Sequence, residues 1–159
     1  MTDDIYPMPA FATFQVADLA ASTRWYVDGL GFHVVAELPG PSGRPALVHL
    51  RRERYQDLLL VPAAAPADTP PGSGVTVSFS AGDLDALAAR ARAVGGGSVE
   101  GPAPTPWNTV DVVAYDPDGY RVVLTGLEGA GHRSVPVGWD RVEEATRGGR
   151  PWGILGDDA

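Results

Sequence analysis

Cysteine and lysine are both absent from this chain of 159 residues, and its 12 basic residues are all arginines. Without cysteine there can be no disulfide, no thiolate nucleophile and no zinc–thiolate site. Long apolar runs are absent too, since none approaches the roughly 20 residues that a membrane-spanning helix needs. The acidic start, Met1–Asp4, is unlike the basic start of a signal peptide. These absences predict a cytoplasmic protein that does not span a membrane.

Positive charge is scarce, because 20 acidic residues against 12 arginines leave a net charge of -8. Such a balance argues against nucleic-acid binding, which needs clustered lysine or arginine. Net acidity favours a cationic ligand through long-range attraction, but the simpler explanation is that it only keeps the protein soluble. With 44% hydrophobic and 20% charged residues, the composition is that of a globular domain. The length suits one domain made of two halves.

One pattern of residues occurs twice, with a spacing of 65 positions. Phe14 and Asp18 in the first copy match Phe79 and Asp83 in the second. Further matches follow each aspartate and pair Leu19 with Leu84 and Ala21 with Ala86. A repeated strand-then-helix unit predicts two modules that share one site between them.

The first module begins with a predicted strand over residues 10–16, because apolar side chains alternate with others there. The alternation places Ala12, Phe14 and Val16 on one face and Phe11, Thr13 and Gln15 on the other. Asp18 is suited to cap a helix over residues 18–29, which Gly29 and Gly31 end. Strands are predicted to follow near 32–37, 45–51 and 56–62, with turns at 39–44 and at Arg51–Arg54, an exposed hairpin end.

The second module repeats this order after a linker over residues 63–74. Its first strand places Val77, Phe79 and Ala81 on one face and Thr76, Ser78 and Ser80 on the other. Asp83 caps a helix that Gly95–Gly97 ends, and strands are predicted near 98–101, 108–115 and 120–126. Asp116–Gly119 is a turn between the last two strands.

The predicted fold is therefore α+β, with two βαβββ modules around a shared cleft. Residues 1–126 form one domain, in which module 1 covers about 8–62 and module 2 about 75–126. Residues 127–159 form a C-terminal extension that contains two tryptophans, Trp139 and Trp152. Because such side chains favour burial, we expect this extension to pack on its own domain, to pack on a dimer partner, or to cover the cleft as a lid.

Four short motifs stand out in the two modules: Val16–Leu19, Trp25–Phe32, Gly82–Leu84 and the D-P-D-G turn Asp116–Gly119. Through these motifs the chain resembles the vicinal oxygen chelate superfamily of glyoxalases, extradiol dioxygenases and bleomycin-resistance proteins, in which F-Y-x-x-x-L-G-F is the counterpart of Trp25–Phe32. The resemblance covers residues 8–126 and implies the two-module fold with a cleft. It also implies where metal ligands stand in the metal-dependent members.

In those members a histidine stands seven residues before each capping aspartate, and here those positions hold Phe11 and Thr76. A glutamate stands seven residues after the first aspartate of D-P-D-G, which here is Val123. Its counterpart in the first module is Leu58 or Leu59. Phe, Val and Leu offer no lone pair and a neutral threonine is a poor ligand for a divalent cation. The resemblance therefore implies no metal and no cofactor, and the remaining candidates His33, His49 and Asp57 lack the family spacing.

Pro106, Trp107 and Asp111 resemble the P-W-G-x-x-E stretch of the bleomycin-resistance branch, with Asn108 in place of glycine and Asp111 in place of glutamate. A tryptophan at a cleft edge offers a flat stacking surface, and a nearby carboxylate attracts a cationic group. The alternative is that Trp107 only closes the rim of the fold and binds nothing.

We therefore predict a homodimeric, metal-independent binding protein that sequesters a bulky aromatic small molecule, cationic ones included, such as an antibiotic or natural product. The predicted ligand-binding residues are Phe11, Gln15, His49, Thr76, Ser78, Trp107, Asp111 and Val123. One alternative is an isomerase, cyclase or lyase that uses acid–base chemistry through Asp111 or His49. A structural or regulatory partner domain is another, favoured if the protein fills its own cleft. A metal-dependent glyoxalase or dioxygenase is least favoured.

Overall fold

The first module folds as one strand, one helix and three further strands, in agreement with its predicted order. The computed structural model describes residues 8–64, 68–69 and 71–127, and the predicted C-terminal extension, apart from Leu127, lies outside them. The elements of this module are β1 (Phe11–Val16), α1 (Leu19–Arg24), the π-helical turn η1 (Trp25–Gly29), β2 (His33–Pro39), β3 (Pro45–Arg51) and β4 (Asp57–Pro62).

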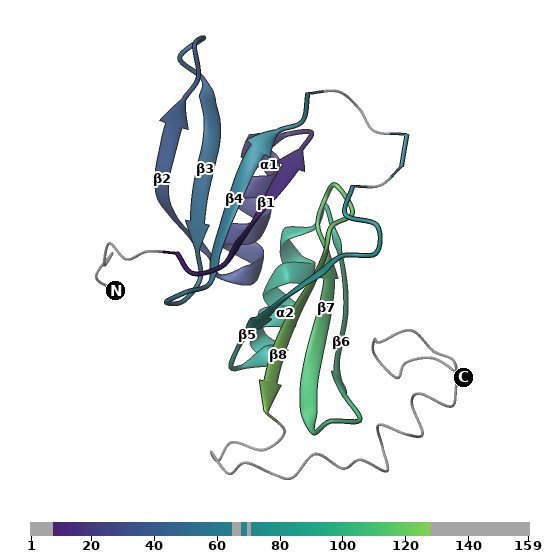
Figure 1. The fold of residues 1–159 in the computed structure, drawn as a ribbon. Coiled ribbons are helices and arrows are strands. Elements are labelled where there is room, and N and C mark those ends of the chain that lie inside the picture. The colour runs from purple at the N-terminus through teal and green to yellow at the C-terminus, as the bar shows by residue number, and fades with distance from the viewer. Residues whose placement is uncertain (1–7, 65–67, 70, 128–159) are drawn as a thin grey trace.

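The second module repeats the first with β5 (Thr76–Ser80), α2 (Leu84–Val94), β6 (Ser98–Pro104), β7 (Thr109–Tyr115) and β8 (Arg121–Leu127). Each module forms a four-stranded sheet, in the order β1-β4-β3-β2 (sheet A) or β5-β8-β7-β6 (sheet B). Within each sheet the first strand runs parallel to the last, and one helix covers one face (Figure 1). The predicted α+β fold of two βαβββ modules is confirmed.

Both helices begin at the aspartates that the repeat singled out. Asp18 accepts a hydrogen bond from the backbone N–H of Ala21 over 2.9 Å, and Asp83 accepts one from Ala86 over 3.2 Å. Each carboxylate satisfies an N–H group that the first helical turn leaves unpaired. The repeat in sequence is therefore a repeat of helix caps.

The predicted turn at Arg51–Arg54 begins one residue too early. Arg51 is the last residue of β3, is 6% exposed, and is directly opposite Asp57 at the start of β4. Its Nε atom donates a hydrogen bond to Asp57 Oδ1 over 2.9 Å, so the ladder continues through this pair. The expectation that Arg51 belongs to an exposed hairpin end is wrong, because a buried carboxylate holds it in the sheet.

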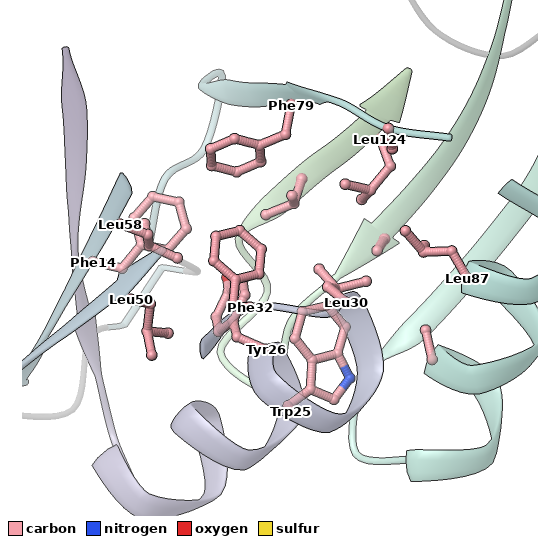
Figure 2. Packing of buried hydrophobic residues seen from close by; sticks show 14 of the residues in the cluster. Phe14, Trp25, Tyr26, Leu30, Phe32, Leu50, Leu58, Phe79, Leu87 and Leu124 are labelled. Atoms are coloured by element: carbon pink, nitrogen blue, oxygen red, sulfur yellow. The ribbon is translucent and has the colours of Figure 1, made fainter. Parts of the chain in front are cut away.

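The buried core continues from one module into the other through aromatic rings. Trp25 and Tyr26 on the first helix are 1% and 0% exposed, and their rings meet edge to face at 4.9 Å. Figure 2 shows Phe32 between Tyr26 of module 1 and Phe79 of module 2. The corresponding ring centroids lie 5.6 and 5.3 Å apart. The Phe32–Phe79 pair joins the two modules, and the Tyr26–Phe32 pair links it to the core of module 1.

The D-P-D-G turn of module 2 docks on the start of the first helix. Asp118 accepts hydrogen bonds from the backbone N–H of Ala17 over 2.8 Å and from the hydroxyl of Ser22 over 3.2 Å. Tyr26 donates its hydroxyl to Asp116 over 2.8 Å. The turn therefore also joins the two modules, because its aspartates accept hydrogen bonds from module 1.

The buried carboxyl of Asp116 gives the stability of the fold a pH dependence. Burial raises the pKa of Asp116 above its ordinary value of 3.8, although hydrogen bonds from Tyr26 and the backbone oppose the shift. Between the ordinary and the raised pKa, the folded protein binds more protons than the unfolded chain. The stabilisation from this group is therefore present at low pH and is lost as the pH rises through the raised value.

We expect Asp116→Asn to remove this fall in stability, because the amide cannot ionise, its oxygen can still accept from the backbone N–H groups of Asp118 and Tyr120, and its NH2 can donate to the Tyr26 hydroxyl. Urea unfolding of both proteins at pH 4 to 7 should show a flatter pH profile for the variant. Identical profiles would contradict the prediction.

Candidate functional site

Each sheet has one face on the core and one face turned away from it, which we call the outer face. On β1, Phe14 and Val16 are buried, whereas Phe11, Thr13 and Gln15 are exposed and belong to the outer face of sheet A. Strand register extends this face to β4 and β3, because directly paired residues point to the same side. The pairs of Phe11 with Asp57, of Thr13 with Leu59 and of His49 with Leu59 place Asp57, Leu59 and His49 on it.

The register also decides between Leu58 and Leu59 as the fourth family position. In sheet B, Thr76 pairs with Arg121, so Val123 lies two residues beyond the partner of Thr76. In sheet A, Phe11 pairs with Asp57, and the same offset leads to Leu59. Leu58 is 0% exposed and belongs to the core, as Figure 2 shows. The position equivalent to Val123 is therefore Leu59.

The side chains at the four family positions do not suit a metal ion. Phe11, Leu59 and Val123 have no donor atom, and the hydroxyl of Thr76 accepts a hydrogen bond from Arg121 over 2.8 Å. A guanidinium at this distance repels a cation. Within residues 8–64, 68–69 and 71–127, no three His, Asp or Glu side chains lie close enough to hold a metal ion. His33, His49 and Asp57 thus form no such group.

His49 is part of a charged cluster on the outer face of sheet A. Its Nε2 atom lies 2.6 Å from Asp57 Oδ1, the same oxygen that accepts from Arg51. Asp57 has no exposed side-chain surface, whereas the side chain of His49 is 16% exposed. The structure therefore places a histidine with an oriented ring beside Leu59, with Phe11 two strands away on the same face.

The outer face of sheet B is more polar at its edge than at its centre. Thr76 and Ser78 on β5 are exposed. The valine pair Val113 and Val123 on β7 and β8 is 2% and 5% exposed. Asp111, on the same face of β7, is half-buried and accepts a hydrogen bond from Thr109 over 3.2 Å.

Trp107 lies in the turn that joins β6 to β7 and is half-buried. The N–H of Thr105 donates to the carbonyl of Thr109 over 2.8 Å and closes this turn. Asn108 adopts a left-handed backbone conformation with φ 63°. Asparagine tolerates this conformation better than most residues, which explains how it replaces the glycine of the similar family stretch.

The predicted ligand-binding residues thus divide into two sets, one on each sheet. Phe11, Gln15 and His49 share the outer face of sheet A, and the others lie on sheet B: Thr76, Ser78, Asp111 and Val123 on its outer face and Trp107 in its β6–β7 turn. Sequence reasoning missed Arg51 and Arg121 as members of these faces. Arg121 could have been found by counting back two residues from Val123, and Arg51 by counting on two residues from His49 along the predicted strand 45–51.

Three comparisons place this geometry among known proteins. A sequence model of the glyoxalase/bleomycin resistance protein/dioxygenase superfamily matches residues 9–124. A glyoxalase/bleomycin resistance protein from Streptomyces sp. CB03234 is 30% identical, with 72% of this chain and 96% of that chain aligned and a TM-score of 0.56. TnmS3, described as an antibiotic binding protein from the same Streptomyces strain, is 27% identical over 80% and 99% of the chains, with a TM-score of 0.59.

A domain from Frankia sp. EAN1pec shares the fold with a TM-score of 0.63 at 18% identity, over 81% of this chain and 97% of that chain. No curated protein is significantly similar in sequence. Among the helices that the structure describes, none is long and apolar enough to cross a membrane.

Proposed function

The chain belongs to the glyoxalase/bleomycin resistance protein/dioxygenase superfamily, and from this premise we propose that it binds a bulky aromatic small molecule without a metal ion and sequesters it unchanged. The observation that carries the proposal is the replacement of the metal ligands at Phe11, Leu59, Thr76 and Val123, together with the guanidinium of Arg121 beside Thr76. The likeness to TnmS3, which is described as binding an antibiotic, supports it. A cytoplasmic location is part of the same proposal.

The two outer faces supply different contacts for such a ligand. Phe11 is 50% exposed, so its ring is open to stacking, and Trp107 offers a second aromatic surface. Gln15 and Ser78 are exposed polar side chains, and Thr76 can still donate its hydroxyl proton, because its oxygen accepts from Arg121. The carboxylate of Asp111 provides attraction for a cationic group on the ligand.

The open edges of β1 and β5 support a homodimer as the functional form. Among the described residues no strand borders either edge. Within the described part of the chain, side-chain hydrogen bonds cover this edge of β1 at Gln15 alone, whose N–H donates to the Tyr120 hydroxyl and whose C=O accepts from it, each over 3.1 Å. The backbone groups of Phe11 and Thr13 face the same edge by strand alternation. Such unpaired edges accept a further strand, and we assign them to a second copy of the chain.

We expect Trp107→Ala to weaken binding of a planar aromatic antibiotic by about tenfold or more, because an aromatic pair contributes up to about 1.5 kcal/mol beyond the area it buries. Isothermal titration calorimetry against a panel that includes bleomycin measures the effect. Trp107→Phe is the matched control and should retain most of the affinity. Equal affinities of wild type and Trp107→Ala would contradict the stacking role.

The same sample distinguishes sequestration from catalysis and from metal binding. We expect the ligand to be recovered unchanged, the purified protein to contain no stoichiometric metal, and sedimentation to give the mass of a dimer. Conversion of the ligand would instead favour an isomerase, cyclase or lyase that acts through His49 or Asp111. Stoichiometric bound metal would contradict the central proposal.

A further inference from the structure

The outer face of sheet A carries a histidine that is anchored through one ring nitrogen. His49 Nε2 lies 2.6 Å from Asp57 Oδ1, and Arg51 Nε donates to the same oxygen over 2.9 Å. The side chain of Asp57 is 0% exposed and that of Arg51 is 7% exposed, whereas that of His49 is 16% exposed. The imidazole is therefore the member of this trio that reaches the surface most.

The contact between Nε2 and Asp57 decides which ring nitrogen of His49 carries the proton. A carboxylate has no proton to donate, so Nε2 is the N–H that donates to Asp57. In the neutral imidazole, Nδ1 then keeps its lone pair and can only accept a hydrogen bond. Within the part of the chain that the structure describes, His49 has no other hydrogen bond or ion pair. Its Nδ1 atom is thus an acceptor that the protein itself does not use there.

The neighbours of His49 indicate which kind of ligand group could donate a hydrogen bond to Nδ1. Leu59 is its strand partner and is half-buried, and Phe11, 50% exposed, lies on the next strand beyond. The charges of Arg51 and Asp57 cancel at close range, so this pair has no net negative charge to attract a cation. A ligand group at Nδ1 therefore has to be an uncharged O–H or N–H donor next to an apolar surface.

We propose that His49 is a fixed hydrogen-bond acceptor for a hydroxyaromatic ligand, whose phenolic O–H donates to Nδ1 while its ring lies against Phe11 and Leu59. This inference rests on the proposed function and names the ligand class of that site. A phenol suits the position better than an aliphatic alcohol, because its hydroxyl is the stronger donor and its ring supplies the stacking surface. The cationic ligands considered above are better matched to Asp111 on sheet B.

The test compares two probes that differ only in the hydrogen-bond donor, 2-hydroxyanthraquinone and 2-methoxyanthraquinone. Wild-type protein should bind the hydroxy compound about five to ten times more tightly, the effect of one net hydrogen bond. In His49→Gln the side-chain amide can still donate to Asp57, but it has no acceptor at the place of Nδ1. The variant should therefore fold normally by circular dichroism and bind the two probes with nearly equal affinity.

Nitrogen-15 NMR of the three histidines measures the ring-nitrogen chemical shifts of His49 directly. A merely structural role of His49 would leave these shifts unchanged when a ligand is added. The ring of His49 should carry its proton on Nε2, and the signal of Nδ1 should shift with the hydroxy probe and not with the methoxy probe. Equal binding of both probes to wild type, or a preference that survives in His49→Gln, overturns this inference and leaves the proposed function intact. Failure of both probes to bind overturns both.

Discussion

Replacing Asp57 by alanine is expected to lower the free energy of unfolding by about 3 to 5 kcal/mol, the usual cost of removing one partner of a buried ion pair. The side chain of Asp57 is 0% exposed and that of its partner Arg51 is 7% exposed. The substitution leaves a guanidinium inside the protein without its counter-charge, and it also releases the ring of His49. Urea unfolding followed by circular dichroism measures the loss.

Two further variants separate the charge effect from the loss of a side chain. Asp111→Ala removes a half-buried aspartate that accepts a hydrogen bond from Thr109, and it should cost only about 0.5 to 1.5 kcal/mol. The double change of Arg51→Met with Asp57→Leu removes both charges and should fall within about 1 kcal/mol of wild type, as apolar replacements of buried ion pairs often do. If Asp57→Ala proves no more harmful than Asp111→Ala, the buried ion pair contributes no more to stability than an ordinary hydrogen bond.

Replacing Tyr26 by alanine is expected to remove about 3 to 5 kcal/mol through the cavity it leaves, and about 1 to 3 kcal/mol more through the hydrogen bond it abolishes. Tyr26 is 0% exposed, packs against Trp25 and Phe32, and donates its hydroxyl to the buried Asp116 of the other module. Because natural domains are stable by only about 5 to 15 kcal/mol, the variant should be largely unfolded at 25 °C.

Tyr26→Phe keeps the ring and tests the hydrogen bond by itself. We expect this variant to fold and to lose about 1 to 3 kcal/mol, because the Asp116 carboxyl loses one of its donors in a buried position. Near-UV circular dichroism reports the packing of the aromatic rings, and urea unfolding reports the stability. A Tyr26→Ala variant as stable as Tyr26→Phe would show that the contacts of the Tyr26 ring with Trp25 and Phe32 carry little of the stability.

Most of the fold could be predicted because its signals are local. The alternation over Phe11–Val16 predicted which side chains face the core, since successive residues of a strand point to opposite faces. Asp18 and Asp83 predicted the helix starts, since a cap acts on N–H groups only two or three residues away. For the candidate site, the same alternation predicted which residues of a strand share a face, but not which strands lie next to one another.

The arrangement of the site could not be predicted from the same signals. Arg51 looked like part of a turn, because its partner Asp57 is identified only by the register of β3 and β4. His49 looked like an isolated histidine for the same reason. Nor could the sequence say that Tyr120 covers the edge of β1 at Gln15, a contact across 105 positions of the chain.

By itself, then, the sequence determined the repeated modules, their caps and the loss of the metal-ligand residue types at Phe11, Thr76 and Val123. Tertiary structure alone decided that Leu59 rather than Leu58 completes that set, and that His49 and Arg51 share one carboxylate oxygen of Asp57. The physical reason is that caps and alternation act within a few residues, whereas strand register and module packing depend on contacts between distant segments.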